Sequence, residues 1–193
     1  MGYAPTMSSS FLYRPHIRQT EGTVVTPDLL IDRVVRPRGG GYAAIPVSQL
    51  TAATALQAPD GAPPGGPCCV LAAATFGMLI SVGAALTDGL AVSRQAWRYD
   101  DVRADLGEAV LRSWSFTGET RRPHLSAALR ELRLPDEADR ALNRSGGLRP
   151  GTMVFFGFPA EAGDSVPAER FEVVLELPDG RALDYACDVT PVG

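Results

Sequence analysis

Residues 65–86 read GGPCCVLAAATFGMLISVGAAL, and nothing between Cys68 and Leu86 carries a charge. Pro67 suits the first turn of a helix, because proline presets φ and lacks an N–H that would have no partner there. Since a helix that is apolar on all sides is buried, the stretch predicts a central buried helix beginning at Pro67. Small residues recur at every fourth position and would let another backbone approach closely; they are Cys69, Ala73, Gly77, Ser81 and Ala85.

A transmembrane helix is the alternative interpretation of this stretch. Nineteen residues in a helix would span about 28 Å, close to the thickness of a bilayer core. The run is rich in Ala, Gly, Ser and Thr, and it has neither an aromatic belt nor a basic flank. These features favour a core helix and predict no membrane association. The N-terminus also lacks the charged-then-apolar pattern of a signal peptide.

Composition indicates one globular domain. The chain has 193 residues, of which 45% are hydrophobic and 21% charged, and its net charge of −4 gives no reason to expect nucleic acid. All 18 basic residues are arginine. A GC-rich genome explains this bias, and selection against conjugation to lysine is an alternative that the sequence does not separate. Three cysteines make no disulfide framework, so we expect reduced thiols and a cytoplasmic protein.

The hydrophobic pattern predicts helices first and strands afterwards. Residues 1–20 show no periodicity and are interpreted as an N-terminal arm, followed by a single domain over residues 21–193. The expected fold class is α+β, with a buried central helix and further helices packed on a C-terminal antiparallel sheet. Beyond the central helix, we expect short or longer helices over 48–56, 101–114, 123–134 and 135–146, and strands over 153–158, 171–177 and 181–187.

Four segments together resemble the bacteriocin-processing (C39-type) peptidases, which have a papain-like fold. They are GGPCCVLAAATFG, TGETRRPHLSAALRELRL, LRPGTMVFFGF and RFEVVLELPDGRALDYACDVTP, within residues 65–191. A cysteine at the start of a buried helix has a lowered thiol pKa, and this family uses such a cysteine with a histidine and a carboxylate from the later sheet. The resemblance therefore implies a papain-like domain with a groove between helix and sheet.

The chain departs from that family at the catalytic positions. When the segments are aligned on Pro67, the nucleophile position falls on Gly65 and the histidine position falls on Arg170, whereas Asp184 or Asp188 keeps the acid. The resemblance then implies a degenerate relative that binds a peptide or a partner protein. Its groove would be formed by Gly65, Gly66, Arg170, Phe171 and Asp188.

Two other functions remain open, so the sequence does not decide whether the chain is an enzyme. An active thiol hydrolase or acyltransferase would use Cys69, or Cys68, with His124 as base and Asp184 as the acid. A structural or assembly protein would oligomerise through the N-terminal arm. Each candidate also has a structural interpretation: buried small residues for the cysteines, a helix-start surface residue for His124, and a surface ion pair for Arg170.

No cofactor or metal is expected from the sequence. The one conceivable metal set combines Cys68, Cys69, His124 and Cys187, and it has no CxxC spacing. The glycine-rich pieces lack the lysine of a phosphate-binding loop.

Overall fold

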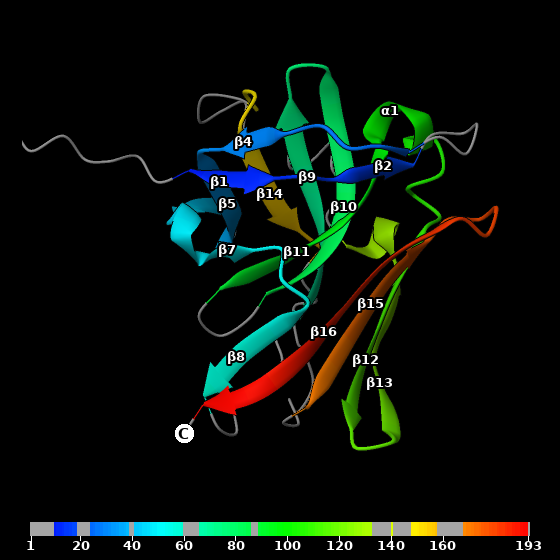
Figure 1. Cartoon of the computed structure of the whole chain (residues 1–193). Helices are drawn as coiled ribbons and strands as arrows, with labels where there is room; N and C mark the ends of the chain where they lie inside the picture. Colours follow the sequence, from blue (N-terminus) through cyan, green and yellow to red (C-terminus); the bar gives the residue numbers. More distant parts are fainter. Residues whose placement is uncertain are drawn as a thin grey trace, which may run out of the picture.

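The protein is built mainly from β-strands (Figure 1). A computed structural model describes residues 10–18, 24–38, 41–59, 66–85, 89–132, 140, 148–157 and 168–192. Apart from strands, the described elements are the one-turn helix α1 (Tyr99–Val102) and the 3-10 turns η1 (Val47–Gln49) and η2 (Leu129–Glu131). The expected α+β papain-like class with a central helix is therefore wrong.

The larger sheet has nine strands and both parallel and antiparallel pairs. Its order is β3-β2-β11-β10-β9-β14-β5-β6, with β7 beside β11. The strands are β2 (His16–Arg18), β3 (Val24–Val25), β5 (Arg33–Arg38), β6 (Gly41–Ile45), β7 (Leu50–Thr51), β9 (Pro67–Ala74), β10 (Gly77–Ala85), β11 (Leu90–Arg98) and β14 (Thr152–Phe156).

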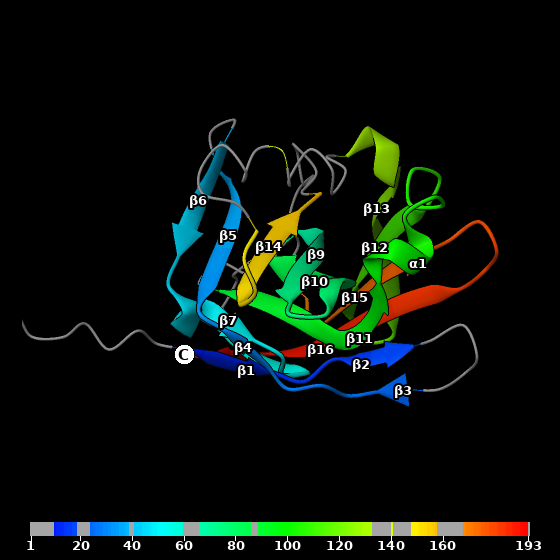
Figure 2. The same ribbon diagram turned by 90° about the horizontal axis from the view of Figure 1, so that it is seen from above.

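Two smaller sheets complete the molecule, and Figure 2 shows from above how β16 passes beside β11. A five-stranded sheet has the order β13-β12-β15-β16-β8, and a separate pair joins β1 to β4. These strands are β1 (Phe11–Tyr13), β4 (Leu29–Ile31), β8 (Ala55–Pro59), β12 (Val110–Thr117), β13 (Thr120–Ala128), β15 (Arg170–Glu176) and β16 (Ala182–Val192).

The stretch expected to be one helix is instead a hairpin of two buried strands. β9 and β10 pair antiparallel from Pro67↔Ala84 to Ala74↔Gly77, and residues 75–76 form the turn. Gly77 has φ 123°, a conformation that favours glycine and lets the chain reverse. Sixteen or so apolar residues can form one helix or two strands, and periodicity does not separate a buried strand from a buried helix.

The uniform apolarity of β9 comes from burial on both faces. Cys69 and Leu71 belong to the core between the nine-stranded and five-stranded sheets, whereas Cys68 and Val70 belong to the core on the opposite face of the large sheet. Neighbours β10 and β14 cover the two edges. A strand in this position has no polar face, so it shows none of the alternation that identifies half-buried strands.

Other expected helices are also strands, for a different reason. Residues 101–114 are helical only as far as Val102, and β12 then alternates between buried and half-buried side chains. Residues 120–128 form β13 where a helix over 123–134 was expected, and the expected helix over 48–56 is only the turn η1. The expected helix over 135–146 lies outside the described residues except for Arg140.

The C-terminal strands agree with the sequence prediction. β14 is buried throughout, and β15 and β16 form an antiparallel hairpin around residues 178–180, where Gly180 has φ 84°. Residues 11–18, assigned from sequence to an arm, form β1 and β2, which pair with β4 and β11. Within the described residues, no helix is long and apolar enough to cross a membrane.

Gly83 marks a close contact between β10 and β11. The pairing of the two strands shifts register between Ser81 and Gly83, and a Cβ added at Gly83 would lie 2.2 Å from the carbonyl oxygen of Ala91. That oxygen is backbone in the middle of the sheet, so it has little freedom to move. Any side chain at this position would force the two strands apart.

We predict that Gly83→Ala lowers the free energy of unfolding by about 1–3 kcal/mol or more, because overpacking strains the sheet. Gly107→Ala is the matched control, since a Cβ there meets nothing within 4 Å. Urea denaturation of both variants measures the effect. Equal stabilities for the two variants would contradict the close contact.

Candidate functional site

A groove of about 620 Å³ opens where β11 passes β16. Three short stretches line it: residues 52–55 before and at the start of β8, residues 93–95 in β11, and residues 184–186 in β16. The alanines supply small apolar walls, which leave the space open. The polar groups come from Thr54, Ser93, Arg94, Gln95 and Asp184.

Hydrogen bonds from β11 to β16 tie the two sheets together at the groove. The Ser93 hydroxyl donates to the backbone oxygen of Asp184 at 2.8 Å, and Gln95 Nε2 donates to Asp184 Oδ1 at 2.9 Å. A carboxylate only accepts, so this contact fixes which end of the Gln95 amide faces Asp184. Gln95 Oε1 is consequently turned away, and it has no partner among the described residues.

Further hydrogen bonds from buried hydroxyl groups hold the backbone of β11 and of the residues before β8. The Tyr13 hydroxyl donates to the backbone oxygen of Ser93 at 2.6 Å, and the Ser81 hydroxyl donates to that of Gln95 at 2.6 Å. The Tyr185 hydroxyl donates to the backbone oxygen of Ala53 at 2.7 Å. Burial raises the pKa of Tyr13 and Tyr185 above the ordinary tyrosine value, so both stay protonated donors at neutral pH.

Arg94 is the cation of the groove. Its side chain is exposed, and within the described residues it has neither a hydrogen bond nor an ion pair. Several other arginines of the described part do have a carboxylate partner, such as Arg112 with Glu176 and Arg149 with Asp32. Arg94 is therefore an exposed arginine at the groove that makes no ion pair within the described residues.

The cysteines do not lie at a helix start. Cys68 and Cys69 are buried within β9, and Cys187 is buried within β16. Burial raises the pKa of all three thiols, that of Cys187 to about 11, which is opposite to what a nucleophile needs. The helix-dipole argument for a reactive cysteine is therefore lost, because there is no helix.

His124 lies on β13, in the other sheet from Cys68 and Cys69. It sits at the register shift between β12 and β13, where its Nδ1 is 3.4 Å from the Ser113 hydroxyl and its ring packs edge-on against Phe171. Its Nε2 is buried with no partner among the described residues. These contacts describe a core histidine, and they bring it to Ser113 and Phe171, not to a thiol.

Of the residues expected to form a peptide groove, Arg170, Phe171 and Asp188 lie together on β15 and β16, and Phe171 is fully buried between the sheets. Gly66 precedes β9, and Gly65 lies outside the described residues. Arg170 is paired with Glu172 at 3.0 Å, in agreement with its structural interpretation, and its backbone neighbour across the ladder is Asp188. Of all the candidates, only Asp184 lines the groove between β11 and β16.

The functional residues that sequence reasoning missed are Ser93, Arg94 and Gln95. They interrupt LAVSRQAW, an otherwise apolar strand, with three consecutive polar residues. The side chains of Ser93 and Gln95 contact Asp184 in the other sheet. Three polar residues in a row inside an apolar strand were the sequence signal that could have identified this part of the groove.

More than half of the chain matches a family described as "Protein of unknown function (DUF2848)", over residues 73–186. This chain belongs to the DUF2848 family. The matched segment runs from the β9–β10 hairpin to β16, so it includes Arg94, Gln95 and Asp184 of the groove. No curated protein matches the chain in sequence.

Solved structures show which fold this DUF2848 chain has. Cg1458 shares 12% identity over 88% of this chain and 80% of its own, with a TM-score of 0.61. Maleylpyruvate hydrolase from Sphingobium sp. SYK-6 shares 15% over 88% and 75%, with a TM-score of 0.60. A 5-carboxymethyl-2-hydroxymuconate delta-isomerase from Mycobacterium smegmatis shares 13% over 86% and 81%, with a TM-score of 0.57.

The fold is thus that of the fumarylacetoacetate hydrolase-like enzymes. The resemblance to papain-like C39-type peptidases is wrong, and with it the interpretations as a degenerate peptide-binding peptidase and as a thiol hydrolase. The described residues of the segments that suggested a helix followed by a sheet form strands and turns in this DUF2848 chain.

A metal ion is suggested by one neighbour, because the Sphingobium hydrolase was also solved with manganese(II) and pyruvate. In the parts of this DUF2848 chain that the structure describes, no three His, Cys, Asp or Glu side chains gather as a metal site would require. The groove contains a single carboxylate, Asp184, which already accepts from Gln95. These residues do not fit a manganese centre, and the Cys68, Cys69, His124 and Cys187 set is not assembled either.

The raised pKa of Cys187 predicts a pH dependence of stability. In the unfolded chain this thiol loses its proton near pH 9, whereas in the folded chain it does so near 11. Its contribution to the free energy of unfolding is therefore present below pH 9 and is lost as the pH rises toward 11. We expect the advantage of the wild type over Cys187→Ala to shrink by about 2 kcal/mol between pH 7.5 and 10.5.

Urea denaturation of both proteins at the two pH values measures this difference. Cys69→Ala is the parallel variant, because its thiol is buried in the other sheet and removing it leaves the Cys187 effect in place. A gap between wild type and Cys187→Ala that stays constant with pH would contradict the raised pKa.

Proposed function

We propose that this chain binds a small organic acid in the groove between β11 and β16, with Arg94 as counter-ion of the carboxylate. The observation that carries the proposal is that Arg94 is one of the residues lining the groove and that its side chain has no ion pair within the described residues. A guanidinium presents two parallel N–H donors that match the two oxygens of a carboxylate. Neutral ligands would leave this charge without a partner.

Gln95 supplies the second recognition element of the proposed site. Its Nε2 is held by Asp184, and its Oε1 is buried without a partner among the described residues. In the proposed complex the Gln95 side chain turns its Oε1 toward the groove, where that oxygen accepts from a hydroxyl or enol group of the ligand. A small acid with a neighbouring hydroxyl or enol would thus satisfy both Arg94 and Gln95, whereas a simple fatty acid would satisfy only Arg94.

The names of proteins with this fold support the same ligand class. Maleylpyruvate hydrolase was solved with pyruvate and manganese(II), and the Mycobacterium smegmatis neighbour is an isomerase of a carboxymethyl hydroxymuconate. These molecules are small carboxylic acids with oxo or hydroxyl groups. At sequence identities of 11–15%, the similarity to these structures shows a shared fold only. It therefore supports a class of ligand for this proposal and does not indicate a reaction.

The groove favours binding over a covalent step. The Ser93 hydroxyl is buried and donates to the Asp184 backbone, so it is not free to attack a ligand. The described residues of the groove therefore hold and orient an acid, and a reaction would require groups beyond them.

Calorimetric titration with pyruvate, maleate and fumarate tests the proposal. We expect at least one acid to bind the wild type, and Arg94→Gln to weaken that binding about 10-fold to 100-fold, the cost of losing a charge-assisted contact. Arg98→Gln is the matched control, because Arg98 lies on the same strand, is exposed and stacks on Phe76 outside the groove. Binding of no acid, or equal affinities of the two variants, would overturn the proposal.

A further inference from the structure

Strand β11 departs from regular pairing with β10 at the residues that line the groove. The register of the pair shifts between Ser81 and Gly83 of β10. As a result, three residues of β11 stand opposite the single residue Val82. Extra residues in one strand form a β-bulge, and bulges are common next to functional sites, where they change the direction of a side chain. The β11 bulge consists of Ser93, Arg94 and Gln95.

The bulge explains why Arg94 is exposed in the middle of a buried strand. Alternate residues of a regular strand share a face, so regular pairing would place Arg94 on the face of Val92 and Ala96. Both of these residues are fully buried in the core on the side of the large sheet away from the five-stranded sheet. An unpaired guanidinium buried there would carry a large free-energy cost. The irregular backbone of the bulge allows Arg94 to remain exposed.

Two buried hydroxyl groups hold the backbone of the bulge. The Tyr13 hydroxyl donates to the backbone oxygen of Ser93 at 2.6 Å. The Ser81 hydroxyl donates to the backbone oxygen of Gln95 at 2.6 Å and lies 3.1 Å from that of Ser93. The backbone oxygens on both sides of Arg94 are therefore fixed by side chains from other strands.

The bulge also contains a hydrogen bond of its own. The backbone N–H of Gln95 donates to the Ser93 hydroxyl oxygen at 3.1 Å, and this hydroxyl donates to the backbone oxygen of Asp184 at 2.8 Å. A serine side chain that accepts from the backbone two residues further on forms a common local turn. The Ser93 hydroxyl thus maintains the shape of the bulge and its contact with β16.

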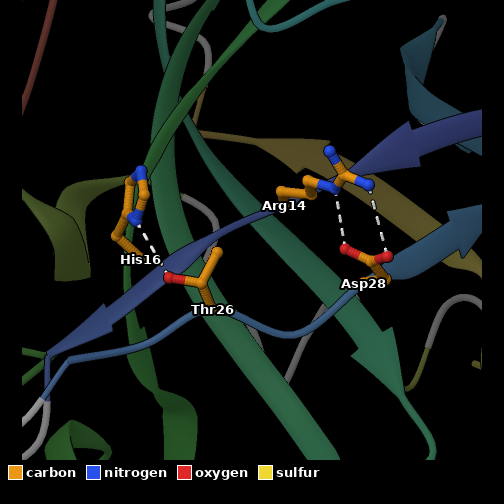
Figure 3. Close-up of polar contacts among 4 residues, drawn as sticks. All are labelled: Arg14, His16, Thr26 and Asp28. Atoms are coloured by element: carbon orange, nitrogen blue, oxygen red, sulfur yellow. Dashed lines mark hydrogen bonds and ion pairs between the residues drawn. The ribbon is translucent and has the colours of Figure 1, made fainter.

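Tyr13 is itself held in place by a two-stranded ribbon. Residues 11–18 and 24–31 form this N-terminal ribbon, whose segments pair antiparallel. Figure 3 shows two side-chain contacts between the segments, Arg14 with Asp28 at 2.8 Å and His16 Nδ1 with the Thr26 hydroxyl at 3.1 Å. The ribbon also pairs with Gln95 of the bulge through His16. These contacts keep the Tyr13 hydroxyl beside the bulge.

Ser81 is explained by the same contacts. It is the one residue of β10 with a hydroxyl group, and the other residues of this strand are apolar or glycine. Its side chain is 3% exposed, so its hydroxyl must find partners inside the protein. The backbone of the bulge supplies those partners.

We propose that Ser81 and Tyr13 are positioning residues, which keep the β11 bulge in the form that exposes Arg94 at the groove. This inference rests on the proposed function, in which Arg94 binds an acid. Neither Ser81 nor Tyr13 is among the residues that line the groove, so both act through the bulge. When one hydroxyl is removed, the bulge adopts other backbone arrangements more often. The apparent affinity for an acid then falls with the fraction of molecules that keep the binding form.

Hydrogen exchange of the Gln95 amide in the absence of ligand tests whether the two hydroxyls hold the bulge. We expect Ser81→Ala and Tyr13→Phe to exchange about 3-fold to 10-fold faster than the wild type, the effect of losing one hydrogen bond. Ser113→Ala is the matched control, because Ser113 is also a buried strand serine, but its hydroxyl lies against His124 in the five-stranded sheet. Exchange at the wild-type rate in both Ser81→Ala and Tyr13→Phe would overturn the proposal.

Calorimetric titration with pyruvate, maleate and fumarate tests the positioning role. We expect Ser81→Ala to bind about 3-fold to 10-fold more weakly than the wild type, and Ser113→Ala to bind as the wild type does. In the Arg94→Gln background, Ser81→Ala should cause little further loss, because the hydroxyl acts through Arg94. A merely structural effect would instead lower the affinity by the same factor in both backgrounds, and that result would contradict the positioning role.

The two failures are distinguishable. A wild type that binds none of the three acids refutes the proposed function, and the positioning role falls with it. A wild type that binds one of them, together with Ser81→Ala of equal affinity, refutes the positioning role alone.

Discussion

Burial of β9 on both of its faces is the constraint on which the structure depends. The strand lies inside the nine-stranded sheet between β10 and β14, and its alternate side chains enter two different cores. One core fills the space between the two large sheets, and the other lies under the N-terminal ribbon. A polar residue at almost any position of β9 would be buried without a partner, at a cost of about 1–3 kcal/mol. The apolar stretch follows directly from this position.

The two large sheets are joined by polar contacts where β11 meets β16. Ser93 and Gln95 reach across to Asp184, and Tyr13 and Ser81 hold the backbone of β11 from the opposite side. A network of this kind is stable because nearly every donor has an acceptor, and it leaves Gln95 Oε1 as the exception. The contacts that line the groove therefore hold the two sheets together. The Arg94 side chain and Gln95 Oε1 take no part in these contacts.

For this DUF2848 protein, the shared fold and the side chains that line the groove support different conclusions about function. Its fold is shared with hydrolases and isomerases of small acids, although identity is 11–15%. A fold supports many activities, and the chemistry resides in particular side chains. Within the described residues, no group of three His, Cys, Asp or Glu side chains could hold a metal ion, whereas an exposed arginine, Arg94, is among the residues that line the groove. The side chains thus support recognition of an acid more directly than they support a reaction.

The sequence by itself determined that most of residues 67–85 are buried, that β14 is a core strand, and that β15 and β16 form a hairpin around Asp179-Gly180. These are local properties, since apolar runs and turn residues act within a few positions. Whether the buried stretch is one helix or two strands was decided only by tertiary structure, because full burial removes the periodicity that distinguishes them. Of the site, the sequence indicated Asp184 alone. Arg94 and Gln95 became a site only when β11 was placed beside β16, some ninety residues later in the chain, and no local pattern encodes that contact.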